Sequence, residues 1–227
     1  MEEAGAPRTA RDGIRAAGPL AVVVGGFGIS FGVLARAAGM GIAAPIAMSM
    51  TTFAGSAQFA AVSIREAGGT VATAVMAAIL LNSRYVPIGL SVAPSLQGSR
   101  LPRFFRAQLV VDESWALASE DDGRFDPGVL LGAGLTLYVA WVAGTALGVV
   151  FGDILGDPAA LGLDAAFPAL FLALLAPQLR SGSARGAASV GAAVALALIP
   201  FAPPGVPIVC ASVGCLLGLR GGPAEAP

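Results

Sequence analysis

A short polar stretch interrupts an apolar segment that runs from about residue 43 to residue 64. It reads Thr-Thr-Phe-Ala-Gly-Ser-Ala-Gln-Phe over residues 51–59. Gly55 weakens a helix, and Ser56 and Gln58 carry groups that must be hydrogen-bonded if they are buried in lipid. A broken helix of this kind can hold a ligand with its freed backbone groups, although Gly and Ser are also ordinary contact residues between membrane helices. The presence of Gln58 favours a binding site over an ordinary contact between helices.

A cation and a carboxylate occupy the next two interruptions. Asn82-Ser83-Arg84-Tyr85-Val86-Pro87 lies within the apolar segment from about residue 70 to residue 94, and Val-Asp-Glu occupies residues 111–113. A charge deep in a bilayer is expected to be functional or paired, unless the long stem of Arg84 carries its guanidinium to the interface. Pro87 removes a backbone donor and is expected to kink its helix.

The composition places the chain in a membrane. Of its 227 residues, 56% are hydrophobic and 12% are charged, and the mean hydropathy is +0.80, which is typical of a membrane protein. All 13 basic residues are Arg, so the chain has no Lys for a Walker-type phosphate loop and no imidazole for a proton relay. The net charge of −1 offers no basic surface for nucleic acid. We expect no catalytic residue, no metal and no cofactor.

The apolar segments predict an all-α fold, a polytopic transmembrane bundle of about 7–8 membrane segments with broken helices. We expect a cytoplasmic tail at residues 1–17, one transmembrane domain over residues 18–220 and a disordered tail at residues 221–227. The expected spans are residues 18–38, 43–64, 70–94, 128–151 and 161–179. Two shorter apolar pieces, residues 187–201 and 206–219, are expected to form a tight hairpin or a broken helix.

The segment between Leu101 and Glu120 decides the topology. Charge bias predicts that the N-terminus is inside and that the span starting at Gly128 also begins inside. Three spans before Pro94 would leave the chain on the wrong side for it. We therefore expect residues 103–119 to cross the membrane. The alternatives are an amphipathic helix on the membrane surface or a re-entrant segment earlier in the chain.

Small residues also form patterns. Gly28 and Gly32 allow close helix contact, and Gly144, Gly148 and Gly152 form a stripe that leaves a groove for a second helix, from this chain or from a partner. Residues 39–48 resemble residues 161–170, and each stretch follows a Gly-rich span. The similarity indicates a possible internal repeat, a plan in which the site lies between two halves.

Taken together, these motifs resemble the AzlC family over roughly residues 15–220. The resemblance rests on the Gly-rich first span, Phe-Ala-Gly-Ser-Ala-Gln at residues 53–58, Asn82-x-Arg84, Val-Asp-Glu at residues 111–113 and Gly-Leu-Asp at residues 162–164, in this order and spacing. It implies the large subunit of a two-component branched-chain amino-acid exporter, multi-pass in the bacterial inner membrane, with a small membrane partner of the AzlD type. Many members have His where this chain has Tyr85, so proton coupling through that position would need another group.

The resemblance implies export of a hydrophobic amino acid, such as valine, leucine, isoleucine or methionine, by alternating access. The carboxylate of this zwitterion would bind Arg84 or helix-end N–H groups near Gly55, and its ammonium group would bind Asp112 or backbone carbonyls. Its aliphatic chain would lie on Phe and Gly surfaces. The candidate substrate-binding residues are Gly28, Phe53, Gly55, Ser56, Gln58, Asn82, Arg84, Asp112 and Asp164. A gradient is expected to drive transport rather than ATP. The alternatives are a passive channel for small neutral solutes and an intramembrane enzyme that uses Ser or Asp chemistry.

Overall fold

The computed structural model describes residues 8–120, 124–155 and 181–214, with a few isolated positions between 169 and 179. Within these residues the regular elements are all helices, which confirms the predicted all-α class, and Ser119 and Phe125 form an isolated β-bridge. The helices are α1 (Ala10–Ala37), α2 (Ala43–Thr52), α3 (Gly55–Glu66), α4 (Val71–Asn82), α5 (Tyr85–Val92), α6 (Arg100–Ala107), α7 (Asp112–Ala118), α8 (Pro127–Leu155), α10 (Gly182–Leu198), α11 (Val206–Ala211) and the 3₁₀ helix η3 (Ser212–Gly214). Asp164 and nearly all of the second half of the predicted repeat, residues 161–170, lie outside the described residues.

Two of these helices, α1 and α8, are long and apolar enough to cross a membrane. Helices α4 and α5 meet the same criterion together if the break between them is counted as an interruption within one span. Helix α10 is apolar but has 17 residues, somewhat fewer than the roughly 20 that a span needs. The described residues thus contain two or three spans by length and composition, and the predicted count of 7–8 is not confirmed.

The chain forms two compact units. The first contains Met1–Gly55 and Ser83–Gly156, and we call it the α1–α8 unit. The second contains Ser56–Asn82 and Asp157–Pro227, and we call it the α3–α4 unit. The chain passes between the units at two of the polar interruptions that the sequence shows, once after Gly55 and once after Asn82.

Helix α1 begins at Ala10, before the expected start of the first span at Gly18. The reason lies in its first turn, where the backbone N–H and the hydroxyl of Thr9 both donate to the Asp12 carboxylate, each at 2.8 Å. This contact satisfies a terminal N–H group that has no partner inside the helix. The helix therefore starts in the polar tail and continues into the apolar segment.

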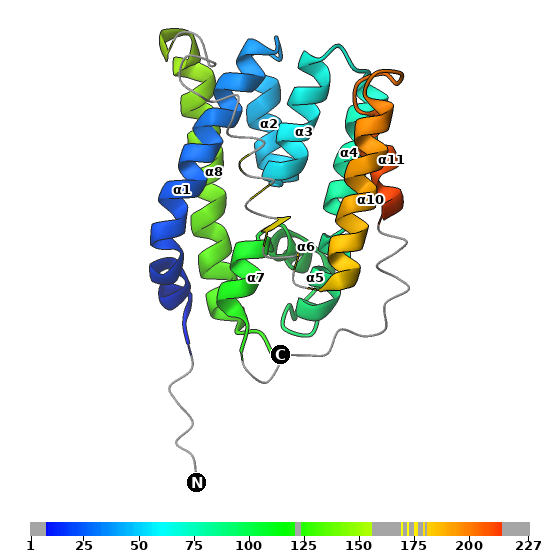
Figure 1. Ribbon diagram of the computed structural model, residues 1–227. Helices are drawn as coiled ribbons and strands as arrows, with labels where there is room; N and C mark the ends of the chain where they lie inside the picture. The colour runs from blue at the N-terminus through cyan, green and yellow to red at the C-terminus, as the bar shows by residue number, and fades with distance from the viewer. Residues whose placement is uncertain are drawn as a thin grey trace. The chain divides into compact units, whose positions relative to one another are not determined.

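Helices α1 and α8 lie side by side and run in the same direction (Figure 1). Gly13 packs against Val129 near the start of both helices, and Gly32 packs against Val149 farther along both. Because residue numbers increase in the same direction along the two helices, both helices would enter the membrane from the same side. This parallel arrangement agrees with the orientation that the charge bias predicts for α8.

The contact between α1 and α8 depends on glycine. A Cβ atom added at Gly28 would lie 2.7 Å from the carbonyl oxygen of Trp141, and one added at Gly148 would meet the backbone of Ile29. Backbones this close require residues without side chains. The predicted groove of α8 is thus occupied by α1 at Gly144 and Gly148. The sequence left open whether a helix of this chain or of a partner enters the groove, and here it is a helix of this chain.

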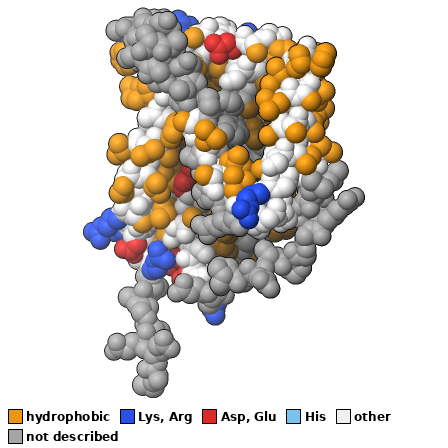
Figure 2. Space-filling view, in the orientation of Figure 1, with side chains coloured by type: hydrophobic (Ala, Val, Ile, Leu, Met, Phe, Trp, Pro, Cys, Tyr) orange, Lys and Arg blue, Asp and Glu red, His pale blue; other side chains and the backbone are white. Residues whose placement is uncertain are grey.

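The outer surface of this pair is apolar. Figure 2 shows hydrophobic side chains spread over this face, with several charged side chains near the end where α1 begins. The exposed side chains include Val22 and Val23 of α1, which are 77% and 55% accessible, and Val139 of α8, which is 56% accessible. Such a surface suits contact with lipid rather than with water.

Helix α2 runs antiparallel to α8 and ends beside its middle. The hydroxyls of Ser49 and Thr145 are 2.9 Å apart, and further along α2 the hydroxyl of Tyr138 lies 2.9 Å from the carbonyl oxygen of Met50. Helix α5 lies nearer the other end of α8, because Ser95, just beyond α5, donates to the carbonyl oxygen of Phe125 at 3.0 Å. From the start of α2 to the end of α5 the chain thus makes one net passage along α8.

The segment containing α6 and α7 returns to the end of α8 from which it came. It follows Ser95, next to Phe125, and after α7 the N–H of Asp126 donates to the carbonyl oxygen of Ala118 at 3.0 Å. With 8 and 7 residues, the two helices span only about 10–12 Å each at 1.5 Å per residue. Both ends of the segment therefore lie at the same end of α8, which contradicts the prediction that residues 103–119 cross the membrane.

Within the α3–α4 unit, α10 and α11 form an antiparallel hairpin, one of the two predicted forms. A Cβ atom at Gly191 would lie 3.0 Å from the carbonyl oxygen of Ala211. The loop before α11 packs against the turn between α3 and α4, where Gly205, in the left-handed conformation at φ 90°, contacts Ile64 and Thr73.

Candidate functional site

The first polar interruption is a break between two helices. Helix α2 ends at Thr52 and α3 begins at Gly55, which confirms the predicted interruption. The turn itself falls at Phe53, which has φ 40° and ψ 53°, and not at Gly55. A non-glycine residue keeps this left-handed conformation only where its surroundings fix it. Here the ring of Phe53 is buried and meets the ring of Tyr138 edge to face, with the centroids 5.2 Å apart.

Side chains from elsewhere satisfy the end of α2. The hydroxyl of Tyr138 donates to the carbonyl oxygen of Met50 at 2.9 Å, and the side-chain amide of Gln108 donates to the carbonyl oxygen of Thr51 at 2.8 Å. The last carbonyl groups of a helix have no partner inside it, and in a bilayer no water replaces that partner. Helix α8 and the turn after α6 therefore stabilise the break.

Gly55 leaves room for an indole ring at the break. A Cβ atom at this position would lie 3.1 Å from Cη2 of Trp141, which is closer than ordinary van der Waals contact. The indole is buried and stacks on Phe31 of α1 with the ring centroids 5.9 Å apart. A larger residue at position 55 would have to move a side chain that is held on two sides.

The second interruption is a break between α4 and α5 at Ser83 and Arg84. Pro87 lies in the first turn of α5, four residues after Ser83. A proline ring clashes with the carbonyl group four residues before it, so the regular helix cannot continue through Ser83. The kink that the sequence predicts at Pro87 is therefore a helix break just before it.

Arg84 and Asp112 form an ion pair at this break. The distance from Nη2 of Arg84 to Oδ2 of Asp112 is 2.9 Å, and the side chains are 33% and 32% exposed. The guanidinium also lies over the ring of Tyr85, with Cζ 5.2 Å from the centroid. Because Arg84 is paired, its charge does not need to reach the interface. Because both side chains keep about a third of their surface open, a ligand can reach them.

Helix α7 presents the carboxylate from a fixed turn. Ser114 is fully buried, accepts a hydrogen bond from the N–H of Val111 at 2.9 Å and donates to the carbonyl oxygen of Leu109 at 3.0 Å. The indole N–H of Trp115 donates to the hydroxyl of Ser91 at 2.9 Å and so ties α7 to α5. These bonds hold the two halves of the ion pair on neighbouring helices.

The other predicted site residues divide among several places. Gly28 lies in the contact between α1 and α8, where the backbone of α8 fills the space beside it. Ser56 and Gln58 are buried in α3, and the side-chain oxygen of Asn82, at the end of α4, is buried without a hydrogen-bond partner among the described residues. These three belong to the α3–α4 unit. Within the α1–α8 unit, the structure brings Arg84 and Asp112 into direct contact.

Sequence reasoning did not find several residues that shape the site. Tyr138 and Gln108 satisfy the end of α2, and Ser114 fixes the turn before Asp112. Each is a polar group within or beside an apolar stretch. That signal could have marked them as groups in need of partners, although it does not say which partners they have.

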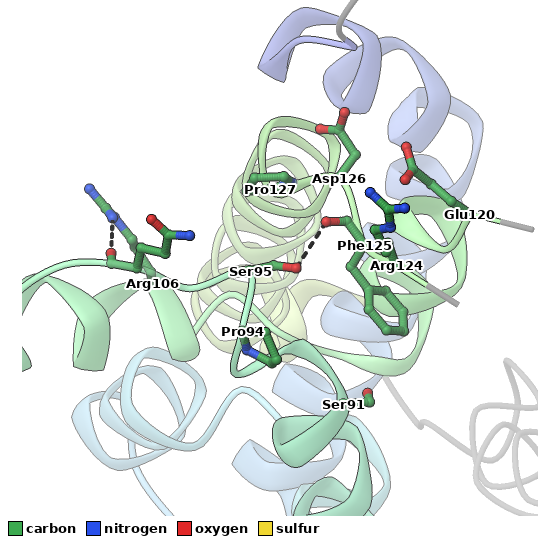
Figure 3. Close-up of a pocket in the computed structure, with 10 residues that line it drawn as sticks. Ser91, Pro94, Ser95, Arg106, Glu120, Arg124, Phe125, Asp126 and Pro127 are labelled. Atoms are coloured by element: carbon green, nitrogen blue, oxygen red, sulfur yellow. Dashed lines mark hydrogen bonds between the residues drawn. The ribbon is translucent and has the colours of Figure 1, made fainter. Parts of the chain in front are cut away.

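A cavity of about 690 Å³ opens near the start of α8 (Figure 3). Arg124, Glu120 and Asp126 lie on one side of it, and the guanidinium of Arg106 is held by the carbonyl oxygen of Gln97 at 2.8 Å. A second cavity, of about 320 Å³, has in its lining Tyr85, whose ring lies beneath the guanidinium of Arg84. It is lined by Tyr85, Gly89, Val92, Ala93, Leu96, Arg103, Ala107 and Val110.

Comparisons with known proteins agree with the motifs. The family model described as AzlC protein matches residues 19–155. An uncharacterized membrane protein of Archaeoglobus fulgidus is 38% identical over 172 residues, which are 74% of each chain. A protein of Bacillus subtilis named branched-chain amino acid transport protein AzlC is 27% identical over 158 residues, 66% of this chain and 60% of that one. No solved structure matches.

The matched region runs from α1 to the end of α8 and so includes both helix breaks, the ion pair and the contact between α1 and α8. It covers more than half of the chain. An uncharacterized membrane protein of Haemophilus influenzae, 27% identical over 178 residues, matches 76% of this chain and 72% of its own. On this evidence the chain is a membrane protein that belongs to the AzlC family.

Proposed function

We propose that this chain is the large, substrate-binding subunit of a transporter that exports branched-chain and other hydrophobic amino acids across the bacterial inner membrane. A small membrane subunit of the AzlD type acts with it, and an ion gradient drives export. The observation that carries the proposal is the half-buried pair of Arg84 and Asp112. The printed name of the Bacillus subtilis relative supports the class of substrate.

The depth of the pair suits a binding site within the membrane. Asp112 begins α7, and α7 ends beside the start of α8. Seven residues of helix make about 10 Å at 1.5 Å per residue, which is about a third of the roughly 30 Å apolar core of a bilayer. An ionised side chain at this depth needs a counter-charge, and each of the two residues supplies it to the other.

An amino-acid zwitterion matches this pair in charge. Its carboxylate replaces Asp112 on Arg84, and its ammonium group replaces Arg84 on Asp112. One ion pair becomes two, and neither side chain is left without a counter-charge. A solute with a single net charge would leave one of the side chains unpaired, at a cost of about 3–5 kcal/mol for a fully buried pair. The site therefore selects zwitterions.

The test is the accumulation of labelled leucine and methionine in everted membrane vesicles, with and without the small subunit and a proton uncoupler. Gradient-coupled export predicts accumulation that needs the small subunit and disappears with the uncoupler. Accumulation that persists with the uncoupler would contradict proton coupling. Equilibration without accumulation or counterflow would indicate a passive channel and would contradict the proposal.

Charge variants connect this transport to the ion pair. We expect Arg84→Ala and Asp112→Asn to lose most leucine transport, and Arg84→Lys to recover part of it, because an ammonium group keeps the charge but not the planar fork of guanidinium. Exchanging the two residues, Arg84→Asp with Asp112→Arg, should restore the ion pair but not the normal rate of transport. Arg11→Ala removes an exposed charge outside the site and is the control. Normal transport in both single Ala and Asn variants would exclude the pair from the site.

A further inference from the structure

The smaller cavity adjoins the ion pair through two residues. Tyr85 lines the cavity and also lies beneath the guanidinium of Arg84, and its hydroxyl oxygen is 3.4 Å from Nη2 of Arg84. Val110, two residues before Asp112, also lines the cavity. The cavity thus adjoins residues that lie next to both members of the ion pair.

The lining of the cavity is mostly apolar. Gly89, Val92 and Leu96 line it from α5 and the turn after it, and Ala107 lines it from the end of α6. Arg103 also lines the cavity, and its guanidinium donates to the carbonyl oxygen of Ala93 at 3.2 Å. A lining that is mostly apolar, with one cation, suits a hydrocarbon group rather than a polar one.

We propose that this cavity receives the aliphatic side chain of the amino acid whose charged groups pair with Arg84 and Asp112, and that its size limits which amino acids are transported. The inference rests on the proposed function. The volume of about 320 Å³ is within the usual range for a small-molecule site and has room for a branched side chain. Gly89 and Val92 are then specificity-determining residues.

Gly89 offers a direct way to reduce this space. It lines the cavity, and a Cβ atom added to it would meet no atom within 4 Å. A side chain at this position therefore enters open space and does not collide with the protein. Gly89→Ala removes a little of the cavity, and Gly89→Leu places in it as many carbon atoms as the side chain of leucine itself carries.

The experiment measures transport of alanine, valine, leucine and methionine by the complete transporter in everted vesicles. Each buried methylene group contributes about fourfold in binding. We therefore expect Gly89→Leu to lower the ratio of leucine to alanine transport at least tenfold, and Gly89→Ala to lower it by a smaller factor. Gly26→Leu is the control, because Gly26 lies in the middle of α1, outside the cavity, and an added Cβ atom there also meets nothing within 4 Å.

The outcomes separate the inference from the proposed function. If the unmodified protein transports no amino acid, the proposed function fails. If it transports leucine and both Gly89 variants keep its leucine-to-alanine ratio, the inference is overturned while the proposed function stands. A loss of transport that is equal for all four amino acids, as expected if a lipid chain occupies the cavity, also overturns it. Gly89→Ala keeps the test decisive if Gly89→Leu does not fold.

Discussion

Replacing Gly148 by Ala tests the packing of α1 against α8. The added Cβ atom would lie 2.9 Å from the carbonyl carbon and 3.0 Å from the Cα atom of Ile29, and closer still to its carbonyl oxygen. Backbone atoms cannot move aside as a flexible side chain does. The two helices must therefore separate by at least about 0.5–1 Å, which forfeits a quarter to a half of the dispersion energy of each contact that opens.

The next glycine on the same stripe is a matched control. A Cβ atom at Gly152 would lie 3.5 Å from the Cα atom of Val33, an ordinary contact distance. Both Gly→Ala changes gain about 1 kcal/mol in helix propensity, so this gain cancels between them. Overpacking costs about 1–3 kcal/mol, and a collision with backbone belongs at the upper end. We expect Gly148→Ala to be less stable than Gly152→Ala by about 3 kcal/mol.

Thermal denaturation in mild detergent measures this difference, with the monodisperse fraction followed by size-exclusion chromatography after heating. For a chain of this length, 3 kcal/mol corresponds to a difference of about 6–12 °C in Tm. A Gly148→Ala protein with a Tm equal to or above that of Gly152→Ala would refute the close contact. Normal stability together with loss of the small subunit would instead place the stripe at a subunit interface.

Two further predictions concern the break after α2. Gly55→Leu should abolish leucine transport while the protein remains in the membrane, because the side chain would displace the indole of Trp141; normal flux in vesicles with matched protein levels would exclude this break from the site. Tyr138→Phe should cost about 1–3 kcal/mol of stability, since it leaves the carbonyl oxygen of Met50 without its donor. Thermal denaturation measures that loss, and Tyr138→Phe with an unchanged Tm would show that the bond contributes little.

The sequence allowed the helix breaks to be predicted, but not their exact positions. Gly55 marked the first interruption, yet the left-handed turn lies at Phe53. Propensity alone favours glycine for such a turn, whereas here the ring contact with Tyr138 and two hydrogen bonds to the last carbonyl groups of α2 determine where the helix ends. These partners come from distant parts of the chain, and their spacing in the sequence gives no sign of them.

The topology of the α6–α7 segment shows a similar limit. Its apolar residues and the number of spans expected before Gly128 favoured a crossing. Charge bias could not correct this prediction, because it constrains only the ends of spans. The decisive facts are contacts, namely those of Ser95 with Phe125 and of Ala118 with Asp126, which bring both ends of the segment to the same end of α8. The ion pair of Arg84 with Asp112 also depends on this return. The sequence therefore marked both charged residues as candidates but did not predict that they pair with each other.

The parallel contact between α1 and α8 also constrains how the protein is made. The ribosome completes α1 long before it reaches α8, and at about 5–20 residues per second the interval is roughly 5–20 s. During this time the glycine face of α1, at Gly28 and Gly32, has no backbone to pack against. Insertion of the first helix is therefore separated from its assembly, and a nascent chain that stops before α8 leaves that face open to other helices in the membrane.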